Sequence, residues 1–365
     1  MKRIAVVMGT RPEIIKLAGL IRLLGKEKGI ETMLVFTGQH YDYNLFNVFM
    51  LELRLPKAEI NLGISGGSNE QQVAAMKQRL SQFFSEKEVG IVVAEGDTNS
   101  VLAAGLAAKE AGAEFAHVEA GLRSFDERMP EEKNRIEADK MADYAFAPTK
   151  GAVKNLESEA IADDRIFLTG NTIVEAVQNN LKKASKSGIL KKLGLKKEKY
   201  AVLTAHRQEY VDRKECLLEL LSAVEKIPLQ VVFPMHPRTM KNLEKFGLLE
   251  RAREINNLKI IGPIGYFDFL QLAGSSMFLL SDSGGIQEEA SVYKKFVIVL
   301  RDSTERPEIL GKFGSLIGYH AEKIALESKR IIHDYPKIKA GMRKEKCPFG
   351  DGKASERIVK ILCRD

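Results

Sequence analysis

The sequence has few of the residues that form disulfides or metal sites. Its 365 residues include three cysteines (Cys216, Cys347 and Cys363) without a CxxC pair, and no tryptophan. An odd number of scattered cysteines indicates free thiols in a reducing compartment, so we expect a cytoplasmic protein. The histidines are also scattered, with no HExxH motif and no Cys/His cluster, so we expect no metal site.

The sequence also lacks long apolar runs, and it lacks basic tracts with interleaved aromatic residues. No run approaches the roughly 18 residues needed to span a membrane, and only five apolar residues separate Arg3 from Gly9. We therefore expect neither a signal peptide nor a membrane segment. The net charge is +7, and lysines concentrate between 182 and 199 without interleaved aromatics. This predicts a solvated connection rather than a nucleic-acid surface, while the positive charge suits a small anionic substrate.

What the sequence does contain is a regular alternation of short apolar runs and helical patterns. Apolar runs on both faces joined by helices are typical of parallel sheets, so we expect two doubly wound α/β domains facing across a cleft. The expected domains are residues 1–170 and 200–350, with a connection at 171–199 and a last helix at 351–365 packing back on the first domain. The expected strands are Ile4–Met8, Met33–Phe36, Ile91–Ala94, Phe115–Val118, Tyr144–Ala147, Ile166–Thr169, Ala201–Thr204, Gln230–Pro234, Lys259–Ile261, Met277–Ser281 and Phe296–Leu300.

The first candidate motif is Gly9-Thr10-Arg11-Pro12-Glu13, which directly follows the first expected strand. A dinucleotide-binding loop would require GxGxxG here, and that pattern is absent. Arg11 and, one turn later, Lys16 stand in its place. At a strand end they are candidates for contact with an anionic ligand, the alternative being ordinary surface charges.

Acidic residues gather at the ends of the next strands. Asp97 follows one strand, Glu119 follows the next, and Glu131 comes shortly after. Carboxylates gathered at one site shift each other's pKa, so that one can act as an acid while another acts as a base. Arg123 and Arg135 would supply compensating charge.

The alternative is a structural ion-pair network on one helix face, made by Glu131, Glu132, Arg135 and Asp139. We favour this structural interpretation for Glu132 and Asp139. For Asp97 and Glu119 we favour catalysis, because carboxylates at strand ends in a cleft are costly unless they are used.

Two further motifs follow strands of the second domain. Ser283, Gly284 and Gly285 lie between an apolar strand and a helix, where free N–H groups can bind a phosphate, and Glu289 lies one turn into that helix. A plain glycine turn is the alternative. His206 follows the first strand of this domain, and His236 occupies a similar place with weaker support.

Taken together, these motifs resemble the non-hydrolysing UDP-N-acetylglucosamine 2-epimerases over nearly the whole chain. The matching segments are GTRPE at 9–13, GQH at 38–40, GDT at 96–98, HVEAGLR at 117–123, PEEKNR at 130–135, TGNT at 169–172, HR at 206–207, DSGGIQEE at 282–289 and RDSTERPE at 301–308.

The resemblance implies a glycosyltransferase-B-like fold, usually a homodimer, that interconverts UDP-GlcNAc and UDP-ManNAc without NAD or metal. It implies that Asp97, Glu119, Glu131, His206, Lys16 and Arg135 are catalytic or orient the substrate. It implies that Arg11, Ser283, Gly284 and Gly285 hold the diphosphate, that Glu289 holds the ribose, and that backbone near Phe269 receives the uracil. Gln39, His40 and His236 match positions near a second, regulatory UDP-GlcNAc site of some members.

The implied route is elimination: a base removes the C2 proton as UDP leaves C1, and the 2-acetamidoglucal is then reprotonated on its other face. Which carboxylate is acid and which is base stays open. The competing functions are a hydrolysing 2-epimerase, a glycosyltransferase of the same architecture, and a non-catalytic UDP-sugar sensor.

Overall fold

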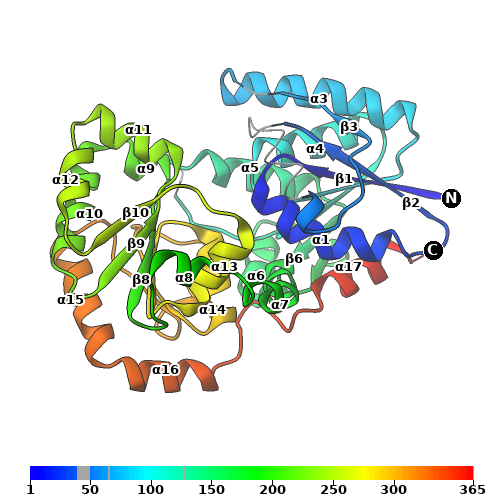
Figure 1. Ribbon diagram of the computed structural model, residues 1–365. Coiled ribbons are helices and arrows are strands. Elements are labelled where there is room, and N and C mark those ends of the chain that lie inside the picture. Colours follow the sequence, from blue (N-terminus) through cyan, green and yellow to red (C-terminus); the bar gives the residue numbers. More distant parts are fainter. Residues whose placement is uncertain (39–49, 65, 127, 365) are drawn as a thin grey trace. The chain divides into compact units, whose positions relative to one another are not determined.

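The chain forms two α/β units, each built around its own parallel sheet (Figure 1). The computed structural model describes residues 1–38, 50–64, 66–126 and 128–364. The first unit comprises Met1–Ala176 together with Phe349–Asp365, and the second comprises Val177–Pro348. Two crossings of the chain therefore connect the units, and the C-terminal segment belongs to the first.

The sheet of the first unit has the strand order β3-β2-β1-β4-β5-β6-β7. Every pairing in it is parallel. The order reverses between β1 and β4, and ligands of such sheets bind beyond the carboxyl ends of the strands at this switch point. Its strands are β1 (Lys2–Met8), β2 (Ile30–Phe36), β3 (Ile60–Asn61), β4 (Ile91–Glu95), β5 (Glu114–Val118), β6 (Tyr144–Ala147) and β7 (Ile166–Leu168).

Helices cover both faces of this sheet. Alternate residues of β1 such as Ala5 and Val7 join a core with α3 and α4, while Ile4 and Val6 are equally buried on the other face. This double burial explains why β1 is apolar at successive positions rather than alternating. The helices are α1 (Arg11–Leu24), α3 (Asn69–Glu86), α4 (Asn99–Glu110), α5 (Pro130–Met141), α6 (Lys150–Ser158), the 3₁₀ helix η1 (Asp163–Arg165) and α17 (Ala354–Leu362); α7 (Thr172–Ala184) contains the boundary between the units.

The C-terminal helix α17 packs against α1, as Figure 1 shows in red and blue. An added Cβ at Gly19 of α1 would lie 3.0 Å from the Ser355 hydroxyl of α17, so glycine permits the close approach. The Lys2 ammonium donates to the Leu362 carbonyl at 2.9 Å, and Ser355 N–H donates to Glu175 at 3.0 Å. The last helix is therefore an integral layer of the first unit.

The sheet of the second unit has the order β10-β9-β8-β11-β12-β13, again with all strands parallel. Its switch point lies between β8 and β11. Its strands are β8 (Tyr200–Thr204), β9 (Gln230–Pro234), β10 (Leu258–Ile261), β11 (Phe278–Ser281), β12 (Phe296–Val299) and β13 (Gly314–Leu316). Its helices are α8 (Ile189–Leu193), α9 (Gln208–Val211), α10 (Lys214–Glu225), α11 (Pro237–Lys245), α12 (Leu249–Glu254), α13 (Tyr266–Ser275), α14 (Gly284–Tyr293), the 3₁₀ helix η2 (Pro307–Ile309), α15 (Ala321–His333) and α16 (Tyr335–Lys344).

The expected fold class is confirmed in each unit, and every strand predicted from the sequence is present. Two short strands, β3 and β13, were not predicted; both lie at sheet edges, where two or three residues leave no periodic pattern. No helix within the described ranges is long and apolar enough to cross a membrane.

Candidate active site

The first candidate site lies at the switch point of the first unit, where the segments after β1, β4 and β5 meet. The loop after β1 is held by Glu13, whose carboxylate accepts hydrogen bonds from the N–H groups of Gly9 and Thr10 and from the Thr10 hydroxyl. Burial raises the pKa of Glu13 to about 7, although these hydrogen bonds partly oppose the rise. Glu13 thereby fixes the start of α1, where Arg11 is half-buried.

Lys16 reaches from the next turn of α1 to two buried carboxylates. Its Nζ lies 2.9 Å from Oε1 of Glu95 and also pairs with Oε2 of Glu119. Asn171 adds an Nδ2–H donor to Glu119 at 2.9 Å. Burial raises the pKa of Glu95 well above its ordinary value; Lys16 opposes this shift and the Glu119 charge reinforces it. One ammonium shared by two buried carboxylates favours a proton on one of them.

The backbone at Glu119 is itself unusual. Its φ is 73°, in the left-handed region that non-glycine residues rarely adopt. The N–H groups of Glu119 and Ala120 both donate to the Phe146 carbonyl at 3.1 Å, which holds this turn on the end of β6. Such strain costs on the order of 1–3 kcal/mol and concentrates at functional sites, consistent with a carboxylate positioned for use.

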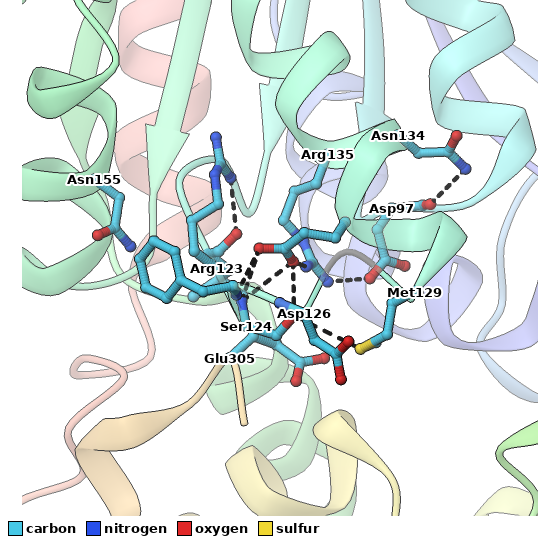
Figure 2. A network of polar contacts seen from close by, with 12 residues as sticks. Asp97, Arg123, Ser124, Asp126, Met129, Asn134, Arg135, Asn155 and Glu305 are labelled. Carbon is cyan, nitrogen blue, oxygen red and sulfur yellow. Dashed lines mark hydrogen bonds and ion pairs between the residues drawn. The ribbon is translucent and has the colours of Figure 1, made fainter. Parts of the chain in front are cut away.

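Asp97 belongs to a second ion-paired group, which Figure 2 shows with its dashed contacts. Arg135 of α5 donates Nη2–H to Asp97 Oδ2 and Nη1–H to Glu132 Oε2, the latter at 2.7 Å. Asn134 Nδ2 donates to the Asp97 carbonyl at 3.0 Å. The Arg135 side chain is 1% exposed and that of Asp97 is 22% exposed, so a buried guanidinium anchors an accessible carboxylate.

Glu132 and Asp139 occupy structural positions on α5. Glu132 accepts N–H bonds from Ser124 and Phe125 at 2.9 and 3.0 Å and so closes the loop before the helix. Asp139 is buried and contacts His117 and Arg123. Glu131 lies in the first turn of α5, partly exposed.

The second candidate site lies at the switch point of the second unit. Asp282, fully buried after β11, accepts from the N–H groups of His206 and Arg207 at 2.7 and 2.8 Å and from the Tyr319 hydroxyl at 3.2 Å. Its other oxygen lies 3.3 Å from His206 Nδ1. The His206 side chain is 36% exposed, whereas Asp282 is buried. The contact with Asp282 therefore orients an imidazole ring that stays accessible.

The second part of this candidate site is the start of α14, which comes just after Asp282 in the chain. Gly284 has no room for a side chain, because an added Cβ would lie 2.7 Å from Nη1 of Arg306. Arg306 is buried and paired with Glu288 at 2.8 Å and with Glu305 at 2.7 Å. Since the N-terminus of a helix offers free N–H groups and a positive dipole end, this turn with its underlying guanidinium is suited to a phosphate group.

The remaining predicted binding residues are placed as follows. Glu289 lies buried on α14 and accepts a hydrogen bond from the Tyr293 hydroxyl. The Phe269 N–H already donates to the Gly265 carbonyl at 3.0 Å in the first turn of α13. The His236 ring caps α11 and lies 5.5 Å from the His206 ring. Gln39 and His40 lie outside the described residues.

The structure thus places Glu119 and Asp97 in two separate ion-paired sets, the first with Lys16 and the second with Arg135. Sequence reasoning missed Glu95 as a member of the first set, Glu13 as the acceptor that holds the loop after β1, and Asp282 as the partner of His206. Glu95 ends β4 and Asp282 directly follows β11, so position at a strand end was the available signal for these two residues. Glu13 is the third residue of α1, and its signal was the Thr10-x-x-Glu13 spacing of a capping box. Among the described residues, no group of three or more His, Cys, Asp or Glu side chains is arranged to hold a metal ion.

Comparison with known proteins assigns the family. The family model for UDP-N-acetylglucosamine 2-epimerase matches residues 22–363. A UDP-N-acetylglucosamine 2-epimerase of Methanocaldococcus jannaschii is 40% identical over 368 residues, covering 99% of this chain and 98% of the relative. A UDP-2,3-diacetamido-2,3-dideoxy-D-glucuronate 2-epimerase of Pseudomonas aeruginosa is 31% identical, covering 99% of both chains.

A solved structure of the M. jannaschii UDP-GlcNAc 2-epimerase, in complex with UDP-GlcNAc and UDP, matches with a TM-score of 0.90 and 40% identity over 99% of each chain. Since both the family model and the relatives span nearly the whole chain, this protein belongs to the UDP-N-acetylglucosamine 2-epimerase family.

Proposed function

We propose that this protein reversibly epimerises UDP-GlcNAc at C2 to give UDP-ManNAc, without hydrolysing it. The observation that carries the proposal is the pair of carboxylate sets at one switch point: Asp97 held by Arg135, and Glu119 held with Glu95 by Lys16. Inverting C2 requires proton removal on one face and proton delivery on the other, and this needs at least two acid–base groups.

The C2 hydrogen is not acidic, because no carbonyl stands beside it. Elimination avoids a free carbanion: a base takes the C2 proton, the C1–O bond breaks, and UDP departs with that electron pair. The resulting 2-acetamidoglucal accepts a proton at C2 on its other face as UDP re-adds at C1. Asp97 is the base we favour, because its anchored carboxylate is 22% exposed, whereas Glu119 is 5% exposed. Glu119 and Glu131 then supply the remaining acid–base groups.

The departing diphosphate requires positive charge. In this proposal, Arg11 and the N–H groups at Ser283, Gly284 and Gly285 stabilise it, and Glu289, oriented by Tyr293, binds the ribose hydroxyls. His206, oriented by Asp282, supplies a further donor or acceptor. The homodimer expected from the resemblance, the uracil contact near Phe269 and a regulatory site including His236 stay predictions.

The decisive experiment is turnover of UDP-GlcNAc in deuterated water, followed by NMR and mass spectrometry. We expect UDP-ManNAc carrying deuterium at C2, and deuterium appearing in recovered UDP-GlcNAc. UDP-ManNAc without deuterium would exclude elimination. Free ManNAc with UDP would indicate the hydrolysing reaction, and UDP binding without any exchange would indicate a sensor.

A second substrate is worth testing in the same assay, because the P. aeruginosa relative acts at C2 of a diacetamido uronate sugar. Faster exchange with UDP-2,3-diacetamido-2,3-dideoxyglucuronate than with UDP-GlcNAc would reassign the substrate while leaving the C2 chemistry intact.

A further inference from the structure

His117 is a fully buried histidine of β5 that the proposed chemistry does not use. Both of its ring nitrogens have partners: Nδ1 lies 2.6 Å from Asp139 Oδ1, and Nε2 lies 2.7 Å from the Gly96 carbonyl oxygen. Gly96 stands between Glu95 and Asp97, the carboxylates that end β4. His117 therefore contacts the backbone of the candidate active site without reaching its surface.

The hydrogen positions follow from the partners. A carbonyl oxygen has no hydrogen to donate, so Nε2 carries one. Asp139 already accepts Gly121 N–H at 3.0 Å and Arg123 Nη2–H at 2.7 Å on its other oxygen. Burial raises the pKa of Asp139, but His117 and Arg123 more than offset this and hold it below its ordinary value. Asp139 therefore accepts from Arg123 and Gly121 with one oxygen and faces Nδ1 of His117 with the other.

We propose that His117, through the hydrogen on its Nε2, is a positioning residue that fixes the Gly96 turn and with it the separation of Asp97 and Glu119. This inference rests on the proposed epimerase activity. The surrounding charges are Asp139 of α5, Arg123 of the loop before it and Glu159, which pairs with Arg123 at 2.7 Å. The Phe115 ring stacks beside the imidazole at 6.1 Å.

The Gly96 turn needs such an anchor because it has no side chain of its own. Its φ is +91°, and no atom lies within 4 Å of where its Cβ would stand. Its N–H donates to the Val118 carbonyl at 3.1 Å, and His117 binds its carbonyl, so both polar groups of the turn are held by β5.

Asp139 connects this anchor to the second carboxylate. It binds His117 through one oxygen and Gly121 N–H through the other, and Gly121 lies two residues after Glu119. One buried carboxylate therefore ties the turn that carries Asp97 to the turn that carries Glu119. Acid–base groups must be placed to within a fraction of an ångström, and a 1 Å displacement can cost about a hundredfold in rate.

Substituting His117 by glutamine or by asparagine distinguishes the hydrogen bond to the Gly96 carbonyl from simple packing of the ring. The side-chain nitrogen of glutamine can take the place of Nε2 and donate to Gly96, whereas that of asparagine can take the place of Nδ1 and reaches only Asp139. Both substitutions remove the ring. We expect His117→Asn to lower kcat and the rate of C2 deuterium incorporation by about a hundredfold, and His117→Gln to retain most of the wild-type rate. KM and UDP affinity should change little in either variant.

Equal losses in the two variants, in proportion to their loss of thermal stability, would overturn the proposal. A second measurement does not depend on activity: ¹⁵N NMR of the histidine-labelled wild-type protein. We expect the His117 ring, assigned by the loss of its signals in the glutamine variant, to carry a hydrogen on Nε2. A ring whose only hydrogen is on Nδ1 would also overturn the proposal, because its Nε2 could not donate to Gly96. Absence of wild-type C2 exchange would instead contradict the proposed function and leave the ring state measurable.

Discussion

The ammonium of Lys16 lies 2.9 Å from a carboxylate oxygen of Glu95, with both side chains almost completely buried. The same ammonium pairs with Glu119. A buried cation with two acidic partners is strongly coupled to them, because removing one partner leaves an uncompensated charge in a medium that solvates it poorly.

Replacing Lys16 by methionine should therefore destabilise the protein by about 3–5 kcal/mol, the usual cost of breaking a buried pair. Adding Glu95→Gln to that variant should restore part of the loss, since it removes one of the stranded carboxylates. Urea unfolding of the four proteins of this cycle measures the coupling. Lys26→Met on an exposed lysine just after α1 is the matched control and should stay within about 0.5 kcal/mol of wild type. If the two substitutions changed the free energy of unfolding additively, the interaction between Lys16 and Glu95 would be contradicted.

Asp97→Asn tests the proposed base. The amide keeps the shape of the side chain and its contact with Arg135, but it accepts no proton from C2. We expect C2 deuterium incorporation to fall by a factor of about 10²–10⁴, the usual contribution of general acid–base catalysis. UDP affinity, measured by calorimetry, should remain close to wild type. Asp164→Asn on the exposed η1 helix is the control. Retained exchange in the Asp97 variant would assign the base elsewhere.

The titration of Glu13 predicts a pH dependence of stability. Burial raises its pKa to about 7, so the folded protein binds this proton more tightly than the unfolded chain does. The resulting stabilisation is complete below the unfolded value of about 4.3, and about 3 kcal/mol is lost as pH rises to about 7. Glu13→Gln, which keeps the acceptor for Gly9 and Thr10, should flatten this part of the curve and be the more stable protein at pH about 8. Thermal unfolding across this range measures the difference; parallel curves would show that Glu13 titrates normally.

Neighbouring glycines of α14 provide a matched pair. A Cβ at Gly284 would lie 2.7 Å from the buried Arg306 guanidinium, whereas one at Gly285 would meet nothing closer than 4.0 Å. Gly284→Ala should cost about 1–3 kcal/mol, as overpacking does, and should weaken UDP binding by displacing Arg306 from Glu288. Gly285→Ala should leave thermal stability nearly unchanged. Equal melting temperatures of the two variants would show that Arg306 moves aside without cost.

Much of the fold could be predicted because buried parallel strands are apolar on both faces. Strands such as β4 (Ile91–Glu95) and β11 (Phe278–Ser281) were recognised in this way. The same reasoning located Asp97 and Glu119, since residues after neighbouring strands meet at one edge of the sheet.

The pairing within the site could not be predicted in the same way. Periodicity places Lys16 on α1, but its long side chain selects Glu95 and Glu119 only through the packing of α1 on β4 and β5. The left-handed backbone of Glu119 has no sequence signal, because glycine rather than glutamate is the usual residue there. The Asp282 contact with His206 joins residues 76 positions apart in the chain, beyond the reach of local patterns.

The packing of α17 on α1 has a consequence for biosynthesis. All of Val177–Pro348 is translated before α17, so a nascent first unit leaves the apolar side of α1 uncovered while the second unit is being made. Ile358 and Leu362 of α17 become fully buried only when that helix docks. The candidate acid–base groups therefore stand on a domain whose folding is completed only after the whole second unit has been translated, and a chain interrupted within the second unit cannot complete it.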